Sequence, residues 1–210
     1  MLLSDSRMRL ELILIAAGAA LTAMQPVCLA QNPVETFASR AASSRVSFDY
    51  SLKMQSSVTL SGSGTVLFEG DGYRIQGNGV TIVSDGATRW TLDEVSREAY
   101  IETVQESGAY LAANPVALLR RIGDAFTQVG TSTARNYTAV EMVPAAEGSG
   151  IRTMTVRFSG QRLSGADITT DDGTVTAIDI SKLVFSDPAG EDFTVDTSAL
   201  GSDWVVTDLR

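Results

Sequence analysis

The alternation of apolar and polar residues constrains this chain most. From Val46 to Met54 every second residue is apolar, and serine, aspartate and lysine lie between them. Successive side chains of a strand point to opposite faces, so this pattern predicts a long strand that is buried on one face only. Shorter runs of the same kind follow, separated by Gly-Asp-Gly, Gly-Asn-Gly and Ser-Asp-Gly. Because Asp-Gly and Asn-Gly favour the tight turns between antiparallel neighbours, we predict a meander rather than a parallel α/β sheet.

The same reasoning predicts further strands along the rest of the chain. They are Gly64–Glu69, Tyr73–Gln76, Val80–Val83, Thr88–Leu92, Ala99–Val104, Thr127–Thr131, Tyr137–Val143, Ile151–Phe158, Ala166–Thr170, Val175–Leu183 and Trp204–Thr207. Residues 144–150 and 186–192 have the composition of loops.

Two short helices are predicted, each beginning with Asn-Pro. Asparagine caps a helix and proline suits its first position, as at Asn32-Pro33 and again at Asn114-Pro115. The first helix covers residues 32–44. The second places an apolar stripe on one face, which comprises Leu118, Leu119, Ile122, Ala125 and Phe126. The fold class is therefore mostly β (α+β), with one domain over residues 31–210.

Residues 1–30 have the plan of a secretory signal peptide. Arg7 and Arg9 precede an apolar run from Leu12 to Met24, and Cys28-Leu29-Ala30 closes the segment with small residues. The run is shorter than the roughly 20 residues that span a bilayer, which disfavours the alternative of an uncleaved anchor. We predict cleavage and export to the periplasm.

Composition excludes several classes of function. The chain has no histidine, and its one cysteine lies in the predicted leader, so Ser-His-Asp and Cys-His catalysis and histidine-ligated metal sites are absent. The net charge of −9 disfavours nucleic acid as a partner. The run Asp171-Asp172-Gly173 lacks the further oxygen ligands of a calcium loop, and we interpret it as a hairpin turn. We expect no metal, no cofactor and no enzymatic activity, although hydrolysis by carboxylates alone stays open.

A strongly curved sheet exposes more apolar surface than two short helices cover, which suggests a hydrophobic cavity. Burial of each CH₂ group contributes about 0.8 kcal/mol, so an acyl chain is a suitable guest. The alternative is that the same residues form an ordinary core. The predicted cavity residues are Phe48, Tyr50, Leu52, Phe68, Ile82, Trp90, Leu92, Leu118, Leu119 and Ile122. Trp90 is expected to share a face with Phe48 and Tyr50.

Three segments resemble LolA-type periplasmic lipoprotein carriers. The stretch Val80–Leu92 is similar to the family's strand, Ser-Asp-Gly turn and tryptophan-bearing strand, Asn114–Leu119 to its Asn-Pro-led helix, and Trp204–Arg210 to its terminal strand. The resemblance implies an open antiparallel half-barrel with helices as a lid over a hydrophobic cavity. It also implies a monomer without cofactor that carries acylated lipoproteins from an inner-membrane lipoprotein-releasing transporter to an outer-membrane receptor.

One segment departs from the family's pattern. The family often has a basic residue and a proline after its second strand, where the arginine helps to hold the lid. Here Glu69-Gly70-Asp71-Gly72 occupies that place, and no such role is transferred to Arg74. An alternative function is therefore a lipid-binding or envelope-sensing module on the same fold, without lipoprotein transfer.

Overall fold

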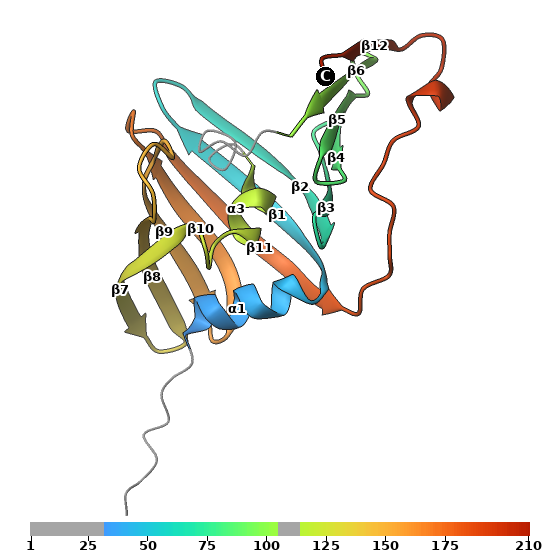
Figure 1. Cartoon of the computed structure of the whole chain (residues 1–210). Helices are drawn as coiled ribbons and strands as arrows, with labels where there is room; N and C mark the ends of the chain where they lie inside the picture. The colour runs from blue at the N-terminus through green and yellow to red at the C-terminus, as the bar shows by residue number, and fades with distance from the viewer. Residues whose placement is uncertain (1–31, 105–113) are drawn as a thin grey trace, which may run out of the picture. The chain divides into compact units, whose positions relative to one another are not determined.

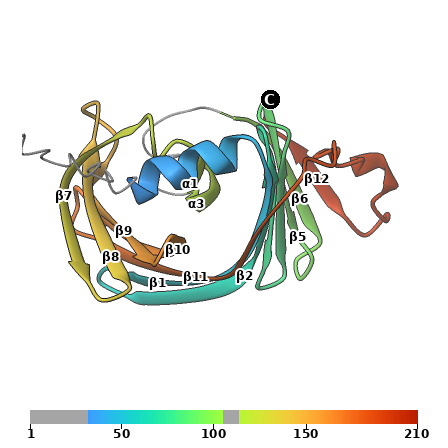
Figure 2. The ribbon, with the colours of Figure 1, turned by 90° about the horizontal axis from the view of Figure 1, so that it is seen from below.

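The described part of the chain forms one open sheet of twelve strands that curves around two short helices (Figures 1 and 2). The computed structural model describes residues 32–104 and 114–210. The folded unit comprises Gln31–Arg210, and the predicted leader lies outside the described residues. Among the described helices, none is long and apolar enough to cross a membrane.

The strands follow the chain as a meander on each side of the sheet's centre. Their bounds are β1 (Arg45–Gln55), β2 (Thr59–Glu69), β3 (Gly72–Gly77), β4 (Val80–Ser84), β5 (Thr88–Asp93), β6 (Glu98–Thr103), β7 (Phe126–Ala134), β8 (Tyr137–Pro144), β9 (Ile151–Ser159), β10 (Arg162–Thr170), β11 (Val175–Ser186) and β12 (Val205–Asp208). The spatial order is β12-β6-β5-β4-β3-β2-β1-β11-β10-β9-β8-β7. The pairing of β1 with β11 therefore joins the two meanders, and the predicted open half-barrel is confirmed.

Both helices lie on the concave side of the sheet (Figure 2). They are α1 (Pro33–Ala42) and α3 (Pro115–Arg120). As predicted, each begins at an Asn-Pro pair: the Asn32 side chain accepts from the amide of Val34 at 3.0 Å, and Asn114 accepts from those of Val116 and Ala117.

The concave face carries one continuous apolar core. It includes Val34, Phe37 and Ala41 of α1, Val116, Leu118, Leu119 and Ile122 of the α3 region, and sheet residues that include Val46, Phe48, Val66, Phe68, Tyr73, Ile75, Val140, Met154, Val156, Phe158, Leu163, Ile168, Ile178, Ile180 and Leu183. At Lys182 the backbone has a φ of 51°, and the β1–β11 ladder shifts register there. This bulge resets the alternation, so that Leu183 joins Ile178 and Ile180 in the core.

A second, smaller apolar cluster contains Val83, Trp90, Ile101 and Phe193. Phe193 belongs to the extended segment between β11 and β12, residues 187–204, which we call the arm. The arm includes a short 3₁₀ turn, η1 (Thr197–Ala199), and passes the convex side of the sheet before β12 (Figure 2). Gly72 makes room for it, because a Cβ atom there would lie 2.2 Å from Phe193 Cδ2.

Several sequence predictions differ from the fold. The second helix ends at Arg120, and Phe126 begins β7 instead of extending the helical stripe; residues 121–125 form turns that contain Gly123, a poor helix former. β12 pairs with β6 in parallel, whereas the half-barrel was expected to be antiparallel throughout. β2 begins at Thr59 rather than Gly64, because it pairs with β1 along its full length.

Candidate guest-binding face

The candidate site is an apolar face of the sheet whose burial changes along β1. Val46 and Phe48, at the helix-covered end, are fully buried. Tyr50, Leu52 and Met54 continue the same face of the strand but are only half-buried. Burial raises the pKa of the Tyr50 phenol. The apolar face of β1 thus runs from the core under the helices into a region that solvent reaches.

Helix α3 covers the buried part of this face. Leu118, Leu119 and Ile122 are at most 3% exposed and belong to the same cluster as Phe48 and Phe68. Tyr50 and Ile82 pack against this cluster from its half-buried rim. The structure therefore brings together seven of the ten predicted cavity residues, and Leu52 lies beside them on the same face of β1. In this structure the helices cover the buried part of the concave face and leave its rim half-buried.

The expectation that Trp90 and Leu92 share that face is wrong. Ile82 lies opposite Thr91, so Thr91 is on the concave side and its neighbours Trp90 and Leu92 point to the convex side. Trp90 packs with Phe193 of the arm, and Leu92 packs against the same cluster. Alternation correctly places the two residues together, but the ladder register assigns them to the opposite side of the sheet.

Two polar contacts hold α3 against the β2–β3 hairpin. Arg120 Nη2 pairs with Asp71 Oδ1, and Arg120 Nη1 donates to the Asp71 carbonyl at 3.2 Å. At the other end of the helix, Asn114 Nδ2 donates to the Tyr73 hydroxyl at 2.8 Å in a buried position. The basic residue is thus on the helix and the acidic residue on the turn. The pairing of distant residues carries no local sequence signal, which explains why sequence reasoning missed Tyr73, Asn114 and Arg120.

Two crevices adjoin α1 on the concave side. One of about 510 Å³ lies between the helix and the β9–β10 hairpin and is lined in part by Phe37, Arg40 and Phe185. The Arg40 guanidinium lies 4.2 Å from the Phe185 ring centroid. The other, of about 250 Å³, is lined by Ala41, Ala42, Phe68, Gly70, Asp71 and Arg120. The second crevice therefore borders the contact that holds α3.

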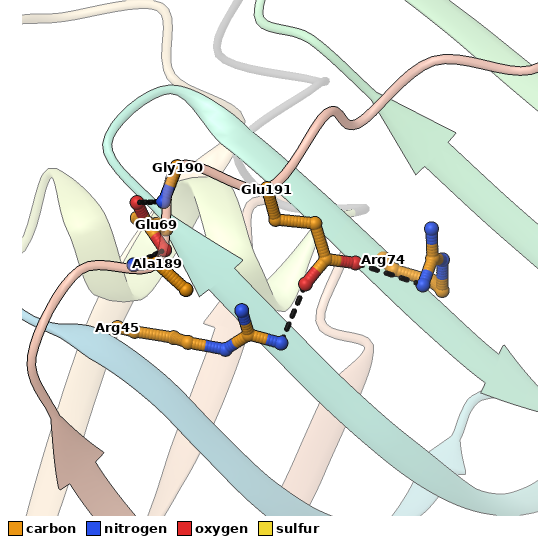
Figure 3. A network of polar contacts seen from close by, with 6 residues as sticks. All are labelled: Arg45, Glu69, Arg74, Ala189, Gly190 and Glu191. Carbon is orange, nitrogen blue, oxygen red and sulfur yellow. Dashed lines mark hydrogen bonds and ion pairs between the residues drawn. The ribbon is translucent and has the colours of Figure 1, made fainter.

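On the convex side, a polar network fastens the start of the arm (Figure 3). Glu191 lies between two arginines, 2.5 Å from Arg45 Nη2 and 2.9 Å from Arg74 Nη1. The Glu69 carboxylate accepts from the backbone amides of Ala189 and Gly190 at 2.9 and 2.8 Å. These two amide donors hold the pKa of Glu69 below its ordinary value. Arg74 therefore binds the arm and makes its ion pair away from α3.

No cluster of three metal-ligating side chains occurs within residues 32–104 and 114–210. The Asp171-Asp172-Gly173 run forms the predicted turn between β10 and β11, and Gly173 has a φ of 85°. The Asp172 side chain accepts from the Thr174 amide at 3.0 Å. The Asp172 carboxylate therefore accepts a hydrogen bond within the turn itself.

Comparison with known proteins identifies the family. The family model described as "Outer membrane lipoprotein carrier protein LolA" matches residues 74–196, more than half of the chain. The chain belongs to the LolA family. The description of that family names a carrier protein. No curated protein matches the chain.

Solved structures that resemble the chain have low sequence identity to it. An uncharacterized conserved protein from Thermus thermophilus is 9% identical, with 85% of this chain and 98% of that chain covered and a TM-score of 0.50. A LolA superfamily protein from Nitrosomonas europaea is 11% identical, with 78% and 98% covered and a TM-score of 0.44. The Pseudomonas aeruginosa MucA/MucB complex contains a chain that is 14% identical, with 83% and 62% covered and a TM-score of 0.34.

Proposed function

We propose that this LolA-family protein is an exported carrier that binds the acyl chains of lipoproteins on its concave face and moves them through the periplasm towards the outer membrane. The predicted leader at residues 1–30 supports export, and the family description supports carriage of lipoproteins. An inner-membrane lipoprotein-releasing transporter and an outer-membrane receptor are the proposed partners. The protein acts as a monomer without cofactor.

The observation that carries this proposal is the short helix α3 seated in a large apolar face. The helix and the turn that follows it bury four apolar side chains, Val116, Leu118, Leu119 and Ile122. At about 2 kcal/mol each, their burial contributes about 8 kcal/mol. An acyl chain with about a dozen methylene groups, at about 0.8 kcal/mol each, contributes about 10 kcal/mol on the same surface. The guest can therefore replace the helix with little net change in apolar burial.

The proposed contacts of the guest follow from this exchange. When α3 withdraws, the acyl chain of the guest lies on five sheet residues, Phe48, Tyr50, Leu52, Phe68 and Ile82. Leu118 and Leu119 of the withdrawn helix, and Ile122 of the turn that follows it, then close over the acyl chain as a lid. Trp90 and Leu92 take no part, because the arm covers them on the convex side.

A second candidate is a lipid-binding or envelope-sensing module that does not transfer lipoproteins. It is favoured by the Glu69–Gly72 turn, where Asp71 binds the lid helix through Arg120 in place of the family's basic residue and proline. Both candidates use the same concave face and differ in the guest.

Native mass spectrometry of the protein, purified gently from the cell envelope, tests the proposal. A co-purifying acylated lipoprotein supports the carrier, and a co-purifying free lipid supports the second candidate. If neither co-purifies and added acyl lipids do not bind, the concave face is a permanent core and the proposal fails.

A further inference from the structure

The concave face changes from apolar to polar between β4 and β5. Ile82 on β4 lies opposite Thr91 on β5, which in turn lies opposite Tyr100 on β6. In the next row, Arg89 lies opposite Glu102. The side chains that β5 and β6 present to this side are Arg89, Thr91, Asp93, Glu98, Tyr100 and Glu102, which we call the polar wall.

The polar wall holds charges of both signs. Arg89 Nη2 and Nε lie 2.6 and 3.2 Å from Glu102 Oε2. The Tyr100 hydroxyl donates to Glu98 Oε2 at 2.9 Å. Arg89 and Glu102 are 31% and 34% exposed, so solvent and solutes reach the ion pair. The wall therefore offers one cation and three carboxylates at the edge of an apolar surface.

Register places this wall within reach of a molecule that lies on the apolar rows. Arg89 is diagonal to Ile82 across the β4–β5 ladder, and such neighbours are about 7–8 Å apart. Arg89 and Glu102 lie directly opposite each other on β5 and β6, so their charges are close together. That spacing suits a headgroup that carries two opposite charges a few bonds apart.

We propose that the guest is a phospholipid-like amphiphile with a zwitterionic headgroup, whose acyl chain lies on the apolar rows and whose head lies on the polar wall. The phosphate binds Arg89, and the ammonium group binds Glu102. An anionic headgroup without an ammonium group leaves its phosphate beside carboxylates that repel it. This inference rests on the second candidate function, the lipid-binding module, and specifies the chemistry of its guest.

Isothermal titration of the purified protein with three lipids of the same acyl chain tests it: myristoyl lysophosphatidylethanolamine, myristoyl lysophosphatidylglycerol and monomyristoylglycerol. We expect the zwitterionic lipid to bind about tenfold more tightly than the anionic one. Arg89→Gln should remove the advantage of the zwitterionic lipid over the uncharged lipid. Arg210→Gln, which removes the same charge outside the wall, should leave that advantage unchanged.

A second variant keeps the test decisive if Arg89→Gln does not fold. Glu98→Gln removes a repelling carboxylate and should strengthen binding of the anionic lipid more than that of the uncharged lipid. Equal affinities for all three lipids, or tighter binding of the anionic one, overturn the headgroup inference and leave the acyl-binding proposal intact. Binding of none of them overturns the second candidate function itself.

Discussion

Replacement of Gly72 by alanine should release the arm from the convex side of the sheet. The new Cβ atom would lie 2.2 Å from Phe193 Cδ2 and 2.7 Å from Cγ, well inside contact distance. Phe193 is 4% exposed, so its displacement removes a buried aromatic ring worth about 2–3 kcal/mol. We therefore expect Gly72→Ala to lower the free energy of unfolding by about 2–3 kcal/mol.

A double-mutant cycle measures whether the ring is the cause. In a Phe193→Ala background the methyl group at position 72 meets no ring, so the two losses should not add, and the coupling energy should be about 2 kcal/mol. Urea unfolding followed by circular dichroism and by tryptophan fluorescence gives all four stabilities. Gly123→Ala is the matched control, because its Cβ would meet only Ala38 Cβ at 3.4 Å. Losses that add to within about 0.5 kcal/mol would refute the packing argument.

Three further predictions concern the lid, the arm and the leader. Arg120→Gln and Asp71→Asn should each lower stability by less than about 1 kcal/mol, since their ion pair is partly exposed, yet increase acyl-lipid affinity in calorimetry because α3 is easier to displace; unchanged affinity in both would contradict this. Because the folded-state pKa of Glu69 lies below its ordinary value of 4.5, its stabilisation of the arm is present above that value and is lost as the pH falls through the lowered pKa. Tryptophan fluorescence should therefore change in acid, and Glu69→Gln should remove that step; a step that persists in the variant would assign it to another group. The intact mass of the exported protein should correspond to a start near Gln31 without an attached lipid, and a retained leader would contradict the predicted cleavage.

Local patterns in the sequence predict most of the sheet and both helix starts. A period of two specifies which residues of a strand share a face, as in β1, where Val46 and Phe48 are buried in the core. The Ser84-Asp85-Gly86 and Asp172-Gly173 turns join antiparallel neighbours as expected. These features depend on a few adjacent residues, and a single sequence contains them in full.

The side of the sheet to which a face belongs is not a local property. Trp90 and Leu92 share a face, but only the ladder from Ile82 to Thr91 places that face on the convex side. What covers it is Phe193, which lies in an irregular segment more than a hundred residues away and has no periodic pattern. The sequence therefore predicted one large apolar surface, which lines a single cavity. The sheet instead carries two apolar clusters, one on its concave side and one on its convex side.

The contacts that hold α3 and the arm in place also escaped prediction, for a similar reason. Asp71 with Arg120, and Glu191 with Arg45, are ion pairs between residues far apart in the chain. The departure at Glu69–Gly72 from the family's pattern is visible in the sequence, but its consequence is not. The fold uses Glu69 to bind the arm on one side and Asp71 to hold α3 on the other.

Photo-crosslinking with a fatty acid that carries a diazirine in its chain tests the central claim most directly. After irradiation of the complex, peptide mass spectrometry identifies the labelled residues. If the concave face binds the acyl chain, the labels should fall on Tyr50, Leu52 and Ile82, and excess unlabelled fatty acid should suppress them. Labels confined to Trp90 and Leu92 on the convex side, or spread over the surface without competition, would contradict the account.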